Sequence, residues 1–258
     1  MKYFSYEGEA HEFDKFRFIS EYQYSYFLDN GENCIPRHNS YYRVSVNSKD
    51  AEDKIEQILR NGITCPDDVN RILAWKIGGI DHEESKRNGR IKFISSWGDE
   101  NSASVLVKNG PFSFECNREE YNDFCKRITE IAQKYEKPFS DEKIESVLKD
   151  IVKEAEKVKG VGPVYILTIL YFITRGQSPI FDRCAYKAVK AIYHEKMPKE
   201  IWYENPSSKS VGDILKVIRD YEWYLEMVFG KRNIDRDTDR ALWVYGHSNL
   251  KLMGMKDA

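Results

Sequence analysis

The sequence contains few cysteines, and their placement excludes several classes of site. Its 258 residues include five, an odd number, scattered along the chain. They form no Cys-x-x-Cys pair and no group of four with the spacing of an iron–sulfur cluster. A disulfide-stapled fold is therefore not expected, and the pattern favours free, buried thiols in a reducing cytosol. The five are Cys34, Cys65, Cys116, Cys125 and Cys184.

Long apolar runs are also absent. The most hydrophobic segment, Val164–Ile173, is too short to span a bilayer, and the N-terminus lacks a basic stretch followed by an apolar one. We therefore expect a soluble, cytoplasmic protein without a membrane partner. His82 and His194 have no partners at metal-ligand spacing, so we expect neither a metal ion nor another cofactor.

The overall charge is low and gives no sign of a nucleic-acid-binding protein, because the formal net charge is −2. The two parts of the chain differ, however. Residues 1–150 contain 22 Lys and Arg against 28 Asp and Glu, whereas residues 151–258 contain 18 against 14. Any polyanion is therefore expected to meet the C-terminal part.

The apolar residues that are present predict a mainly α-helical fold. They make up 41% of the chain, which is enough for a core. Spacing by three and four residues predicts helices over residues 48–60, 67–77, 118–135, 140–158, 163–174, 182–193, 211–229 and 238–245. Short β-like runs at 91–94, 104–108 and 112–116 predict a small antiparallel β element in the N-terminal half. The expected class is α+β, with helices dominant.

The domain organisation follows from where the periodicity changes. Residues 1–47 lack clean periodicity and are expected to form irregular structure or short strands, and residues 81–90 a charged loop. Asn117 and Glu120 have the spacing of a capping box at the start of a helix. We therefore expect a mixed α/β region over residues 1–117, packed on a helical region over 118–258 as a single globular unit.

The most informative stretch is Lys159-Gly160-Val161-Gly162-Pro163-Val164, which lies between two apolar helical segments. Glycines on either side of Val161 let the backbone come close to a neighbour, while Val161 itself is expected to enter the core. Pro163 suits the first position of the next helix. The free N–H groups and positive dipole end of that helix can hold a phosphate without reading a base. A purely structural turn between two helices would have the same pattern.

Together with Pro179-Ile180-Phe181-Asp182-Arg183, this stretch resembles the helix-hairpin-helix DNA glycosylase superfamily. That superfamily includes endonuclease III and the adenine, alkyl-base and 8-oxoguanine glycosylases. Asp182 lies 22 residues after Gly160, and the catalytic Asp of the family follows the first hairpin glycine at that spacing. The resemblance is strong over residues 140–195 and is closest to bacterial proteins of the 8-oxoguanine glycosylase fold.

The resemblance implies a monomeric DNA N-glycosylase with helix-hairpin-helix domains, acting on a damaged or modified base flipped from double-stranded DNA. Asp182, ionised at a helix N-terminus, would stabilise the oxocarbenium-like sugar and activate water. Val164 occupies the position of the Schiff-base lysine of bifunctional members, so β-lyase activity is not expected. The entry Val158-Lys159 departs from the family's Leu-Pro. The DNA contacts implied are Lys159, Gly160, Val161, Gly162, Arg183 and Lys187.

A flipped base needs a pocket with aromatic or apolar walls. Trp243, Tyr245 and His247 on the last predicted helix are candidates, and so are Tyr165 and Trp75. Ordinary core packing is the alternative for each of them. Asp182 likewise could serve only as the cap of its helix.

Two other functions remain open from the sequence. One is a non-catalytic DNA-binding module that uses the hairpin, which would bind duplexes in a salt-sensitive way without releasing a base. The other is a helical protein whose Gly-Val-Gly turn is purely structural, which would not bind DNA even at low salt.

Overall fold

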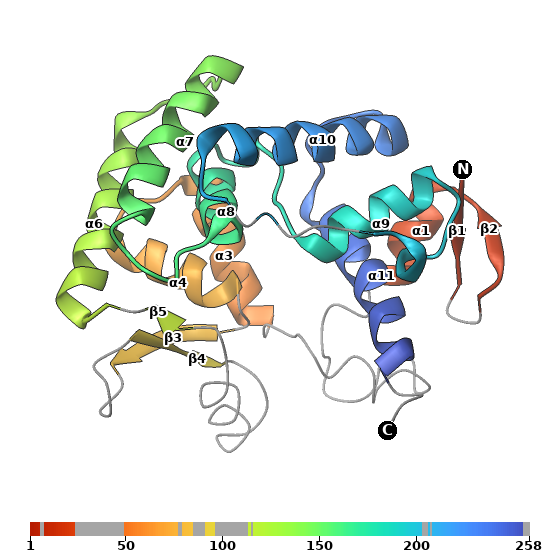
Figure 1. Cartoon of the computed structure of the whole chain (residues 1–258), viewed down its shortest axis with the longest axis horizontal. Helices are drawn as coiled ribbons and strands as arrows, with labels where there is room; N and C mark the ends of the chain where they lie inside the picture. The colour runs from red at the N-terminus through yellow and green to blue at the C-terminus, as the bar shows by residue number, and fades with distance from the viewer. Residues whose placement is uncertain are drawn as a thin grey trace. The chain divides into compact units, whose positions relative to one another are not determined.

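The computed structural model describes residues 1–5, 8–23, 49–76, 79–84, 91–95, 113–114, 116–202, 206 and 208–254. Helices dominate these residues, accompanied by two small antiparallel sheets (Figure 1). This confirms the mainly α-helical class with a small antiparallel β element. Within the same residues, no helix combines the length and hydropathy needed to cross a membrane.

The chain divides into two compact units. The first consists of Met1–Val46, Pro179–Asn205 and Val217–Ala258, and the second of Asn47–Ser178 and Pro206–Lys216. The units therefore do not follow the single boundary that we expected after residue 117. Each is assembled from segments distant in the sequence, and the periodicity within one segment carries no information about which other segment covers its apolar face.

The second unit is built around a buried helix. Nine of the eleven residues of α8 are buried, and α8 packs against α7 and α4 (Figure 1). The Trp75 ring meets the edge of Phe172 at 5.9 Å between centroids, and its indole N–H donates to the buried Glu52 carboxylate at 2.5 Å. The helices of this unit are α3 (Lys49–Asn61), α4 (Pro66–Lys76), α6 (Arg118–Lys134), α7 (Asp141–Ala155) and α8 (Pro163–Ile173).

Side-chain caps begin two of these helices, and the one at α6 was predicted from the sequence. Asn117 and Glu120 form the predicted capping box of α6: the Asn117 side chain accepts from the Glu120 N–H, and the Glu120 carboxylate accepts from the Asn117 N–H, both at 2.9 Å. Ser140 caps α7 through the Lys143 N–H. Such bonds satisfy amides that have no partner within the helix, which is why these residue types mark its start.

The three-stranded sheet of the second unit has the order β3-β4-β5, with β3 (Gly79–Glu84), β4 (Ile91–Ser95) and β5 (Ser113–Phe114). The charged stretch from residue 81 to 84, expected as a loop, is therefore part of a strand. It pairs antiparallel with β4, whose backbone supplies hydrogen bonds whatever the side chains of β3 are. The strand predicted at residues 104–108 lies outside the described residues.

The first unit combines β1 (Lys2–Phe4), β2 (Ala10–Glu12), α1 (Lys15–Gln23), α9 (Arg183–Tyr193) and α11 (Arg236–Gly254), with a short 3-10 helix over Pro198–Glu200. The long helix α10 (Val211–Phe229) begins in the second unit and continues into the first. The sequence did not predict α1. Its buried residues Phe18 and Tyr22 stand among other aromatic residues of similar hydrophobicity, so the apolar residues show no clear helical spacing. An aromatic core joins α1 to α11, with the Tyr22 and Tyr245 ring centroids 5.0 Å apart.

The helix α11 approaches α9 more closely than side chains normally allow. A Cβ atom at Gly246 would lie 2.0 Å from the carbonyl oxygen of Cys184, in the first turn of α9. The predicted helix ended at Tyr245, whereas α11 continues through Gly246 to Gly254. Gly246 therefore allows two helices to pack closely and does not end α11.

Candidate functional site

The hairpin between α7 and α8 has the backbone conformation that its glycines predict. Gly160 has a φ of 107°, in the left-handed region that favours glycine. Val161 is completely buried, as expected, and its N–H donates to the Val158 carbonyl at 3.3 Å. Lys159 and Gly160 are exposed. The hairpin is therefore fixed in the core by Val161 and presents its glycine backbone to solvent.

The N-terminus of α8 is open for a ligand. Gly162 is the N-cap residue and Pro163 follows it at the first helical position, while no described side chain caps this end. A Cβ atom added at Gly162 would meet nothing within 4 Å. Amides at such an end have no partner within the helix, and the helix dipole adds positive potential there. This geometry suits a phosphate oxygen.

Asp182 is the N-cap residue of α9, in the first unit. Its backbone is extended, and its Oδ1 atom accepts a hydrogen bond from the Cys184 N–H at 2.7 Å. The side chain is half-buried, between the exposed Arg183 and the fully enclosed Phe181. The carboxylate is thus held in one orientation at a helix N-terminus, where negative charge is favoured.

Tyr221 on α10 is a buried polar group that the sequence did not indicate, and it contacts Phe181, the residue before Asp182. Its ring lies 5.7 Å from that of Phe181 and 5.5 Å from that of Tyr186, between centroids. Its hydroxyl is buried and makes no hydrogen bond to a described residue. Burial raises the pKa of this phenol well above its usual value, and the charges of Asp239 and Asp182 raise it further. Tyr221 therefore stays a neutral donor close to two carboxylates.

The first turn of α11 is largely buried, although its sequence is highly charged. Arg236-Asp237-Thr238-Asp239-Arg240 reads as a solvated, charged first turn, yet Arg236, Asp239 and Arg240 are all at least 90% buried. Arg236 and Asp239 form an ion pair with each other, and Arg240 pairs with Asp237 at 3.0 Å. The charge of Asp239 is one of the two that raise the pKa of Tyr221. Only the packing of α11 could reveal this burial.

The side chains predicted to contact DNA differ in their accessibility. Arg183 is exposed at the first position of α9, as a phosphate contact requires. Lys187, one turn further, is only 9% exposed. Burial lowers its pKa; the nearby Cys184 acts in the opposite direction, and Arg183 lowers it further. Lys187 therefore offers little surface to a phosphate.

The candidates for a base pocket are divided between the two units. Tyr245 is completely buried in the first unit, and its hydroxyl accepts a hydrogen bond from the Phe4 N–H at 3.0 Å, so it has no surface to offer a base. Trp243, on the same helix, is half-buried, and the side chain of His247 lies outside the described residues. Tyr165, in the second unit, packs its ring 5.1 Å from Phe114.

No metal site is present in the described part of the chain, where no three His, Cys, Asp or Glu side chains are grouped to hold an ion. Comparisons of the chain with protein-family models, with curated proteins and with solved structures give no match. A functional assignment must therefore be argued from the hairpin, from Asp182 and from the spacing that separates them.

Proposed function

We propose that the protein is a monofunctional DNA glycosylase that removes a damaged or modified base from double-stranded DNA. The observation that carries this proposal is the conformation of Asp182. It is a half-buried carboxylate fixed at the N-terminus of α9, 22 residues after the first glycine of a hairpin whose helix N-terminus is open. Val164 stands where a Schiff-base lysine would be needed, which favours base removal without strand cleavage.

Asp182 would act on the sugar of the flipped nucleotide. As the bond between C1′ and the base nitrogen breaks, its electron pair leaves with the base and C1′ becomes cationic. An ionised carboxylate beside C1′ stabilises this charge and accepts a proton from the attacking water as the new C1′–O bond forms. The hydrogen bond from the Cys184 N–H to Oδ1 holds the carboxylate in place for this role.

The catalytic part of the proposal is tested with Asp182→Asn. Asn is as good an N-cap as Asp, because its amide oxygen can accept the same bond from Cys184, so the fold should be kept. Duplexes carrying oxidised, alkylated, deaminated or otherwise modified bases are incubated with the protein, and the free base is quantified by mass spectrometry. We expect Asp182→Asn to slow base release by about 100-fold or more. Equal rates for variant and wild type would refute the mechanism.

The DNA-binding part is tested with Gly162→Ala. The added methyl meets no protein atom within 4 Å, so the fold should tolerate it, but it occupies the space through which a phosphate would approach. We expect duplex affinity to fall by about tenfold, the equivalent of one hydrogen bond to a charged group. Gly212→Ala, at another open glycine of the same unit, is the matched control and should bind DNA like the wild type.

One observation favours the alternative of a non-catalytic DNA-binding protein. The bond from the Cys184 N–H to Asp182 is also the bond that a purely structural cap would make. That alternative predicts the same effect of Gly162→Ala on DNA affinity, but no base release from any duplex. The two assays together therefore separate the functions.

A further inference from the structure

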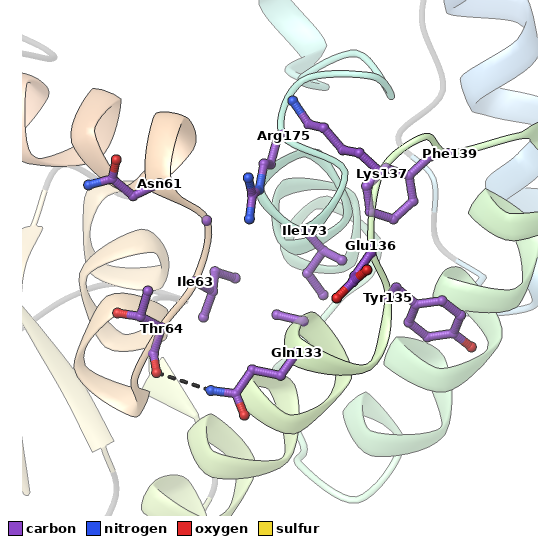
Figure 2. A pocket seen from close by; sticks show the side chains of 12 residues that line it. Asn61, Ile63, Thr64, Gln133, Tyr135, Glu136, Lys137, Phe139, Ile173 and Arg175 are labelled. Atoms are coloured by element: carbon purple, nitrogen blue, oxygen red, sulfur yellow. Dashed lines mark hydrogen bonds between the residues drawn. The ribbon is translucent and has the colours of Figure 1, made fainter.

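The second unit contains a pocket that the proposed function does not use. It encloses about 540 Å³, which is within the range of small-molecule sites. Its walls come from the α3–α4 connection, from the end of α6 and the chain after it, and from the end of α8 (Figure 2). The hairpin lies at the other end of α8, about 16 Å away for a helix of eleven residues. The pocket is thus a site of its own.

Arg175 supplies an uncompensated positive charge to this pocket. Among the described residues, its side chain has no ion pair and no hydrogen bond. Its guanidinium lies against the backbone of Gly62, where a Cβ atom would be 2.8 Å from Nη2. The backbone of Arg175 itself has a φ of 50°, which is uncommon for a residue other than glycine. Glycine at position 62 therefore makes room for the guanidinium.

The turn that carries Arg175 is fixed before any ligand arrives. The Gly176 N–H donates to the Tyr171 carbonyl at 2.9 Å, and the Ser178 N–H donates to Thr174 Oγ1 at 3.1 Å. Gln177 accepts a hydrogen bond from the Phe139 N–H at 2.9 Å, which ties the turn to the opposite wall. These bonds fix the backbone from which the exposed Arg175 side chain reaches into the pocket.

Glu136 faces the same pocket without neutralising Arg175. Figure 2 shows its carboxylate reaching inward from the chain after α6, while the Arg175 guanidinium enters from the end of α8. No ion pair joins them, since within the described residues the Glu136 carboxylate has none. In the same view the buried side chain of Ile173 lies beside the Glu136 carboxylate, and that of Ile63 lies on the α3–α4 side of the pocket. Both charged side chains are exposed, so a ligand that contacts both would meet a cation at one end and an anion at the other.

The chemistry of the two ends identifies a class of ligand. A guanidinium binds phosphate oxygens through two parallel N–H donors, and Lys137 on the rim adds a second cation for a dianionic phosphate. A carboxylate accepts hydrogen bonds only, and among the nucleobases guanine offers it two adjacent N–H donors. Within a lining that is mostly polar, the side chain of Ile173 offers an apolar surface to the face of a ring. We propose that this pocket binds a guanine nucleoside monophosphate, with the phosphate at Arg175 and the base at Glu136.

The test is calorimetric titration of the full chain with dGMP, inorganic phosphate, deoxyguanosine and dAMP. We expect saturable dGMP binding with a Kd below about 1 mM. The other three should bind at least about tenfold more weakly, because each lacks one of the polar contacts. A duplex with a 5′-terminal phosphate is titrated as well, to distinguish binding of a free nucleotide from binding of a DNA end. Binding of dGMP no tighter than that of phosphate, or no saturable binding, would overturn the proposal.

Variants assign the binding to the pocket. Arg175→Asn removes the guanidinium while Asn tolerates the left-handed backbone, and should weaken dGMP binding by about tenfold to 100-fold. Glu136→Gln should remove the preference for dGMP over dAMP. Arg127→Ala makes the same charge change on the exposed face of α6, outside the pocket, and should leave dGMP affinity unchanged. If Arg127→Ala weakened dGMP binding as much as Arg175→Asn, the loss would come from the lower net charge of the protein, and the assignment of binding to this pocket would be wrong.

Discussion

Gly246 is predicted to be one of the least replaceable residues in the first unit. Its Cα faces the first turn of α9, and the Cβ of an alanine would lie 2.0 Å from the Cys184 carbonyl oxygen and 2.6 Å from the carbonyl carbon. Ordinary contacts at a Cβ begin at 3.4 Å, so the separation is 1.4 Å too short. Because both obstructing atoms belong to the backbone, no side-chain rotation can relieve the overlap, and α11 must move away from α9.

The expected loss of stability can be bounded. Overpacking a core typically destabilises by 1–3 kcal/mol, and a clash with backbone belongs at the upper end, so we expect about 3 kcal/mol for Gly246→Ala. For a protein of this size, each kcal/mol lowers Tm by about 2–4 °C, which gives a decrease of about 6–12 °C. The displaced turn of α9 also contains the Cys184 N–H that orients Asp182, so base release by the proposed mechanism should fall as well.

Gly212→Ala is the matched control in a thermal melt followed by circular dichroism. Gly212 is also a helical glycine, in α10, but an added Cβ would meet nothing within 4 Å. Alanine is favoured over glycine in helices by up to about 1 kcal/mol, so this variant should melt at or above the wild-type temperature. If Gly246→Ala melted within about 2 °C of the wild type, less than 1 kcal/mol would be lost, and the close approach of α11 to α9 would be refuted.

Three further predictions concern other parts of the molecule. Asp182→Ala removes the cap of α9 and should lower the free energy of unfolding in urea by about 1 kcal/mol, whereas Asp182→Asn should leave it nearly unchanged; equal losses would contradict the capping bond. Val161→Ala empties a fully buried site and should destabilise the hairpin by about 2 kcal/mol in the same assay, and a loss near zero would mean that Val161 does not fill the core. Burial alone would raise the pKa of Asp235, but hydrogen bonds from Thr238 and the charge of Lys231 outweigh it and lower the pKa to about 2. Asp235 therefore contributes stability that is fully present above its ordinary pKa of 3.8 and is lost as the pH falls toward 2. Thr238→Val should make the free energy of unfolding depend less on pH in this range. An unchanged pH dependence would argue against the interaction between Thr238 and Asp235.

Local sequence signals predicted most of the helices. The capping box at Asn117 and Glu120 and the proline at the start of α8 both mark helix starts, because each satisfies or avoids an amide that the helix cannot pair. The left-handed Gly160 and the buried Val161 of the hairpin follow from the same kind of information. The same signals placed Asp182 correctly at the N-terminus of its helix, whereas its candidate catalytic role came from the resemblance to the glycosylases.

Contacts between distant segments could not be predicted from any of these signals. The sequence by itself determined most helix positions, though neither α1 nor the full length of α11, and it supplied the hairpin and Asp182 as candidates. Only the tertiary structure decided that Lys187 and the charged start of α11 are buried, that Gly246 contacts α9, and that Gly62 accommodates Arg175 at a pocket. The physical reason is range: capping and periodicity depend on atoms a few residues apart, whereas burial depends on which segment folds back to cover a surface.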